Sequence, residues 1–199
     1  MRQSPAMSCA LLVLSGCAFG PLVSSESART VGAGRKELVA GYGQLGPVFK
    51  FDYGLKSNWD VGFQGELLSV GVRTKYAFVN NQEKGFSLAG ALGIGKSIDG
   101  SHAYADVMGS YLSGAWEPYL TGRFVHVKTD PSELLDVITH VLDLRVESSE
   151  YNYAQTMLGL RYWMSEHWML TAEASSLVAL SGGSFKATPF ATGTLGFRF

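Results

Sequence analysis

Apolar and polar side chains alternate along short segments from Lys36 to the end of the 199-residue chain, with turn residues between the segments. Alternation with period two is typical of β-strands, because successive side chains of a strand point to opposite faces. The pattern predicts strands at 36–44, 47–55, 58–67, 69–79, 85–96, 102–113, 115–128, 150–163, 167–179 and 185–199. In the clearest of them, Phe49 and Phe51 share one face while Lys50 and Asp52 share the other.

The composition limits what these strands can build. Charged residues make up 17% of the chain, against roughly 25% in a typical soluble domain. No run of 18 apolar residues exists, so no transmembrane helix is expected. A membrane protein without such helices must be a closed barrel, because lipid leaves open backbone groups unsatisfied. We therefore expect an all-β fold, a closed antiparallel up-and-down transmembrane β-barrel of about ten strands. Eight strands remain an alternative if two of the weaker hairpins are loops.

The tryptophans favour a barrel in lipid over a soluble, lipocalin-like barrel lipoprotein, which would show the same alternation. If β-strand 36–44 starts in the periplasm, every second turn lies at the periplasmic rim. All four tryptophans fall close to such turns: Trp59, Trp116, Trp163 and Trp168. Clustering at one rim is typical of an aromatic girdle at a lipid interface. The apolar faces are therefore expected to contact acyl chains.

The polar faces carry charges of both signs in balance. The cations are Lys50, Arg73, Lys75, Arg123, Arg161 and Arg198, and the anions are Asp52, Asp60, Glu66, Asp106, Glu117 and Glu173. Interleaved with small residues, this set predicts a narrow lumen that is crossed by ion pairs. Wide diffusion of solutes through such a barrel is not expected.

The first residues form a targeting segment. Residues 1–16 combine a basic residue at Arg2, an apolar run at 10–14 and small residues after it, which is the layout of a secretory signal peptide. Residues 17–34 are rich in Ser, Gly and Ala and predict a flexible periplasmic linker. The barrel domain is expected over 35–199, with the N-terminus in the periplasm.

The end of this signal, Leu14-Ser15-Gly16-Cys17, resembles the lipobox of bacterial lipoproteins. The resemblance implies cleavage before Cys17 and acylation of that cysteine. The alternative is an ordinary peptidase site over 16–18, in which Cys17 is incidental.

The last strand ends in Leu195, Phe197 and Phe199 on one face. These residues resemble the C-terminal signal by which outer-membrane barrels are recognised by their assembly machinery, although Thr194 stands where that signal has glycine. As a pattern over 36–199, the chain resembles small bacterial outer-membrane β-barrel proteins. The resemblance implies a location in the bacterial outer membrane, with outer-membrane lipid and the barrel assembly machinery as partners.

The gap between the seventh and eighth predicted strands, 129–149, contains a helix signal. Asp130-Pro131 is typical of a helix start, and apolar residues follow at helical spacing from Leu134 to Leu142. We expect a short amphipathic helix in an extracellular loop. It either contacts an extracellular ligand or packs its apolar stripe onto the barrel rim.

No set of residues indicates an enzyme, a metal site or a cofactor. Both cysteines, Cys9 and Cys17, precede the barrel, and the histidines are scattered. His126 faintly resembles the strand histidine of lipid A deacylases, but Lys128 occupies the place of the nucleophilic serine. Asp136 and His140 are spaced to pair on the loop helix, without a nucleophile.

The function expected from the sequence is therefore a structural, narrow-channel or surface-binding role, with no catalytic residue. An outer-membrane enzyme that acts on lipid A or peptides is the alternative. A net charge of −1 argues against nucleic acid as a partner.

Overall fold

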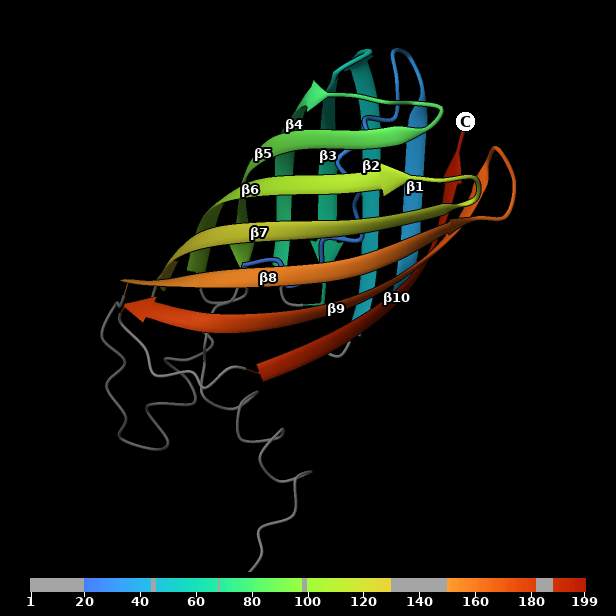
Figure 1. Ribbon diagram of the computed structural model, residues 1–199. Helices are drawn as coiled ribbons and strands as arrows, with labels where there is room; N and C mark the ends of the chain where they lie inside the picture. Colours follow the sequence, from blue (N-terminus) through green and yellow to red (C-terminus); the bar gives the residue numbers. More distant parts are fainter. Residues whose placement is uncertain (1–19, 44–45, 68, 98–99, 130–149, 182–187) are drawn as a thin grey trace, which may run out of the picture.

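The computed structural model describes residues 20–43, 46–67, 69–97, 100–129, 150–181 and 188–199. These residues form a single sheet of ten strands (Figure 1). The strands are β1 (Lys36–Gly43), β2 (Gly46–Lys56), β3 (Trp59–Glu66), β4 (Ser69–Val79), β5 (Gly85–Ser97), β6 (Gly100–Leu112), β7 (Trp116–Thr129), β8 (Glu150–Trp163), β9 (Trp168–Ser181) and β10 (Thr188–Arg198). The bounds agree with the predicted strands to within three residues, because alternation is a local property of the backbone.

The sheet closes on itself. Each strand pairs antiparallel with its neighbours in sequence, and β1 pairs with β10 in a register from Glu37↔Arg198 to Gly43↔Thr192. The predicted closed antiparallel up-and-down barrel is confirmed, with ten strands and not the alternative eight. Closure leaves no strand edge without a partner, which is the condition for placing a sheet in lipid. Within the described part of the chain, no helix is long and apolar enough to span a membrane.

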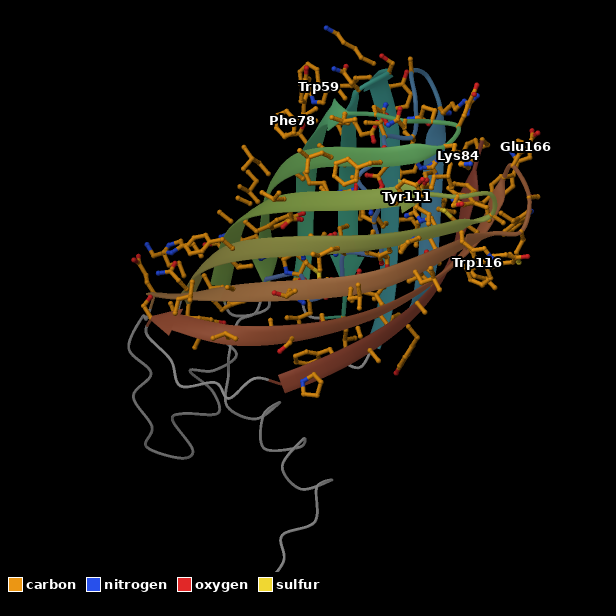
Figure 2. All side chains as sticks on the ribbon, viewed as in Figure 1. Trp59, Phe78, Lys84, Tyr111, Trp116 and Glu166 are labelled. Atoms are coloured by element: carbon orange, nitrogen blue, oxygen red, sulfur yellow. The ribbon has the colours of Figure 1, made fainter. Side chains whose placement is uncertain are left out.

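The barrel wall has its apolar face outside and its charged face inside. In β2, Phe49 and Leu55 have exposed fractions of 42% and 44%, whereas Lys50 and Asp52 are each 1% exposed. Labelled side chains such as Phe78 and Tyr111 likewise point away from the interior (Figure 2). A soluble lipocalin-like barrel would bury the phenylalanines and expose the ions. The observed arrangement contradicts that alternative.

The two ends of the barrel differ in their connections. One end, which we call the tryptophan rim, holds the turns 57–58, 80–84, 113–115 and 164–167, the start of β1 and the chain end. There the Lys36 amide donates to the Phe199 carbonyl at 2.7 Å. At the other end, called the opposite rim, strands are joined through 44–45, 67–68, 98–99, 130–149 and 182–187. The helix predicted within 129–149 falls almost wholly outside the described residues, as do the signal peptide and Cys17.

Residues 20–31, which we call the lumen segment, run inside the barrel (Figure 1). At the opposite rim, a Cβ built on Gly20 would lie 3.1 Å from the Tyr153 hydroxyl and 3.5 Å from the His102 Cβ. At the tryptophan rim, the Val31 amide donates to Asp60 at 3.0 Å. These residues belong to the range expected as a free periplasmic linker, so the structure differs from that prediction. The physical reason is that the inward-facing charges need partners, and Glu26, Arg29 and the backbone groups of this segment supply them.

Candidate functional site: the occupied lumen

Two carboxylates of the barrel wall bind consecutive backbone amides of the lumen segment. Glu66 of β3 accepts hydrogen bonds from the amides of Leu22 and Val23, both at 3.0 Å. Glu173 of β9 accepts from the amides of Ser24 and Ser25 at 3.0 and 2.9 Å. Ser25 has a positive φ of 45°, which is uncommon for a residue other than glycine and marks a tight bend of the chain. The two carboxylates thus accept hydrogen bonds from backbone amides that are not part of any strand pairing.

The backbone carbonyls of the same segment receive donors from the wall. Arg123 donates to the Pro21 carbonyl at 2.7 Å, and Gln64 donates to the Val23 carbonyl at 2.7 Å. Further donors reach other carbonyls of the segment: Arg161 at Ser25 (2.9 Å), Lys75 at Arg29 (2.8 Å), Lys50 at Ser24 (3.2 Å) and Gln155 at Leu22 (2.5 Å). The wall therefore holds the main chain of the segment on both its donor and its acceptor groups.

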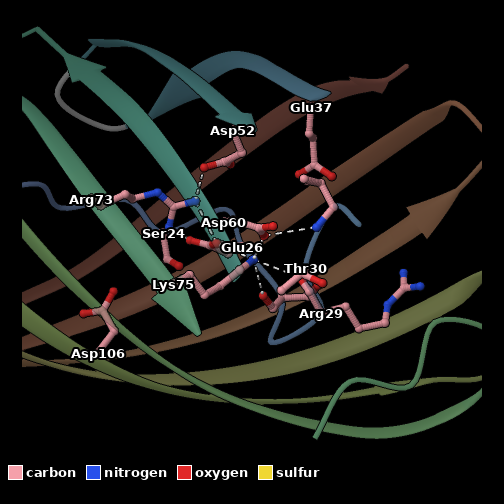
Figure 3. Close-up of polar contacts among 12 residues, drawn as sticks. Ser24, Glu26, Arg29, Thr30, Glu37, Asp52, Asp60, Arg73, Lys75 and Asp106 are labelled. Atoms are coloured by element: carbon pink, nitrogen blue, oxygen red, sulfur yellow. Dashed lines mark hydrogen bonds and ion pairs between the residues drawn. The ribbon is translucent and has the colours of Figure 1, made fainter. Parts of the chain in front are cut away.

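Glu26 is the centre of the ionic contacts in the lumen (Figure 3). Its carboxylate lies 3.1 Å from Lys50 Nζ and 2.6 Å from Lys75 Nζ, and it accepts a hydrogen bond from Arg73 at 2.7 Å. The Glu26 side chain is 2% exposed. Asp52 shares Arg73 at 2.6 Å. A carboxylate so far from water is stable only with such compensating cations.

Arg29 secures the segment near the tryptophan rim. Its guanidinium donates twice to Glu117, at 2.8 and 2.6 Å, in the two-pronged geometry that matches a carboxylate. The Arg29 side chain also lies over the Trp163 ring, 5.2 Å from its centroid. The indole of Trp163 donates to the same Glu117 at 3.1 Å. Cation, carboxylate and ring together close this end of the lumen.

Trp163 therefore differs from the predicted aromatic girdle, because it faces inward. It follows Arg161 on the same face of β8, so the inward position of Arg161 requires an inward Trp163. The other three predicted members, Trp59, Trp116 and Trp168, are 38%, 51% and 44% exposed on the outer surface at the tryptophan rim. Figure 2 labels Trp59 and Trp116 at this rim.

The C-terminal aromatic residues lie beside these tryptophans. Leu195, Phe197 and Phe199 share the outward face of β10, and the rings of Phe197 and Trp168 are 4.7 Å apart. Their predicted recognition by the assembly machinery stays a prediction.

The charged set read from the sequence divides into two groups. Some members pair within the wall, as Arg198 does with Glu37 at 2.5 Å. Glu66, Glu117 and Glu173 instead bind the lumen segment. Strand periodicity alone does not predict these contacts with the lumen segment. Glu26 and Arg29 could have indicated these contacts. They are the only charged residues between 17 and 34, and a flexible linker does not require them.

Apolar side chains fill the lumen towards the opposite rim. Leu22 packs in a buried cluster that comprises Tyr104, Val125, Val127, Tyr151, Tyr153 and Leu177. The lumen segment thus packs against apolar side chains at one end and makes ionic contacts through Glu26 and Arg29 farther along.

The residues considered for catalysis do not form a catalytic set in the described part of the chain. His126 is on the outer face of β7, and its Nδ1 is 2.9 Å from the Asn152 Oδ1. The Asn152 amide donates to Ser181 Oγ at 2.8 Å, so an amide separates the histidine from that hydroxyl. Asp136 and His140 lie outside the described residues. No group of three or more His, Cys, Asp or Glu residues suited to a metal occurs among the residues with described positions.

Comparison with known proteins places the chain by fold. No protein-family model matches it, and no curated protein matches it. Among solved structures, the NanC porin has a TM-score of 0.51 at 8% identity, covering 82% of this chain and 98% of that one. The N-terminal β-barrel domain of Pseudomonas aeruginosa OprF has a TM-score of 0.43 at 14% identity, with 84% and 99% covered. Ail of Yersinia pestis has a TM-score of 0.40 at 16% identity, with 84% and 100% covered. The fold is that of outer-membrane β-barrels.

Proposed function

We propose that this protein is a non-enzymatic outer-membrane barrel whose lumen is kept closed by its own N-terminal segment. Its role is then structural or surface-binding, and the alternative of an open diffusion channel is disfavoured. The observation that carries the proposal is the seating of residues 20–31 against the inward-facing wall, with Glu26 and Arg29 paired to wall charges. A barrel of this size has little interior volume beyond its side chains, and here a chain segment takes up the rest.

The apolar exterior supports the location in the outer membrane. Large exposed apolar side chains cover the outer face from Leu38 in β1 to Leu195 in β10, and so extensive an apolar surface is not stable in water. The outward tryptophans at one rim suit the boundary between acyl chains and headgroups.

Single-channel recording in planar bilayers tests the closed lumen. The refolded full chain is compared with a variant that lacks residues 20–31, and gel mobility with and without boiling verifies that each forms a barrel. We expect the full chain to show no steady conductance and the shortened variant to conduct. A full chain that conducts as much as the shortened variant would refute the proposal.

We further propose that Cys17 carries the lipid anchor of a bacterial lipoprotein. The support is the lipobox-like motif that ends at Cys17 after an apolar run. Labelled palmitate should be incorporated into the wild type and into Cys9→Ser, but not into Cys17→Ser. Equal labelling of both variants would contradict acylation at Cys17.

A further inference from the structure

The lumen segment has a defined direction through the barrel. Its early residue Leu22 binds Glu66 at the end of β3 on the opposite rim, whereas Arg29 binds Glu117 at the start of β7 on the tryptophan rim. A turn follows, in which the Arg35 amide donates to the Gly32 carbonyl at 3.1 Å. The chain then enters β1. It therefore runs from the opposite rim to the tryptophan rim before the first strand begins.

The lengths of the connections indicate which rim faces which side of the membrane. Outer-membrane barrels have short periplasmic turns and longer extracellular loops. All connections at the tryptophan rim are short, the longest being 80–84, whereas the opposite rim includes the long connection 130–149. The tryptophan rim is thus assigned to the periplasm and the opposite rim to the cell surface.

From these two observations we infer that the chain before Gly20 leaves the barrel on the extracellular side. The protein carries its own N-terminus through the lumen to the cell surface. The inference rests on the proposed function for the outer-membrane location and for the seated segment. It reverses the sequence-based expectation of an N-terminus in the periplasm.

The position of Gly20 has a consequence for the proposed lipid anchor. Gly20 is the third residue after Cys17, so their Cα atoms are at most about 11 Å apart. Because Gly20 lies near the opposite rim, acyl chains on Cys17 would enter the outer leaflet and not the periplasmic leaflet. The partner of this surface anchor is a lipid surface on the outside of the cell.

A disulfide between the segment and the wall tests the path. The Val23 Cγ2 atom lies 3.4 Å from the position of a Cβ on Gly43, at the opposite-rim end of β1, which suits a disulfide. The double variant Val23→Cys, Gly43→Cys should oxidise and migrate differently after reduction. Val31→Cys, Gly43→Cys serves as a matched control, with its two positions at opposite rims, and should stay reduced. The reverse result would overturn the direction of threading.

Epitope accessibility on intact cells tests the membrane side. One epitope is inserted between Ala18 and Phe19, and the same epitope is inserted in the turn between Glu83 and Lys84 as the control. We expect antibody binding to the first on intact cells, and to the second only after the outer membrane is permeabilised. Protection of the first epitope in intact cells would overturn the inference.

The result of the epitope experiment does not depend on whether the lumen is closed to ions. A protected N-terminal epitope together with a non-conducting full chain refutes surface display and leaves the proposed function standing. A full chain that conducts as much as the variant without residues 20–31 refutes the proposed function. A surface-accessible epitope without palmitate labelling upholds the inference and removes only the lipid anchor.

Discussion

Removing the charge of Glu26 should loosen the lumen segment while the ten-stranded sheet stays intact. The Glu26→Gln variant keeps the size of the side chain and deletes the carboxylate that faces Lys50, Lys75 and Arg73. Breaking a buried ion pair by removing one partner costs about 3–5 kcal/mol. Asp52 and Asp60 stay within 2.6 and 3.3 Å of Arg73 and Lys75, so we expect the lower end of that range.

The cost translates into occupancy of the lumen. If a loss of about 3 kcal/mol falls on the seating of the segment, the ratio of closed to open barrels drops about 100-fold. The barrel wall itself should persist, because its backbone pairing around the closed sheet is unchanged. In planar bilayers, the variant should therefore show opening events that are rare or absent in the wild type.

The matched control is Glu83→Gln, the same chemical change in an exposed residue of the 80–84 turn. It should behave as the wild type. The reasoning is refuted if Glu26→Gln, folded by gel mobility, shows no more openings than Glu83→Gln does.

Three further predictions concern the segment, the lipid-facing wall and catalysis. Arg29→Glu should increase channel openings, because the new carboxylate repels Glu117. The double variant Arg29→Glu, Glu117→Arg should restore closure in part. If the effects of the two single variants on the opening frequency simply add in the double variant, the pairing is contradicted. Leu158 lies on the outer face in the middle of β8, and Leu158→Arg should lower the free energy of unfolding in lipid vesicles by about 2–4 kcal/mol. Met164→Arg, near the rim, should lower it by about 0–1 kcal/mol. Equal losses for the two variants in urea titrations would argue against lipid on this face. His126→Ala should leave the lipid A profile of cells that express the protein unchanged by mass spectrometry, since the ring pairs with the amide oxygen of Asn152. An altered profile would revive the enzymatic alternative.

The sequence by itself determined the strands and their two faces. Phe49 and Lys50 illustrate this, because the pleat sends neighbouring residues to opposite sides wherever the strand lies in the sheet. The inward face of Trp163 also follows from the sequence, because Trp163 is two residues after Arg161 on β8; closeness to a turn does not distinguish the two faces of a strand. Closure into a barrel followed from the apolar outer face, which only a sheet without edges can present to lipid.

Only the tertiary structure decided what fills the lumen. Glu66, Glu117 and Glu173 bind residues that are 44, 88 and 149 positions away in the chain, and no local pattern carries such distances. The lumen segment has neither strand alternation nor helical spacing, since wall side chains and not a neighbouring strand satisfy much of its backbone. The position of this segment depends on the closed barrel, because the partners of its amides and charges come together only when the ten strands close.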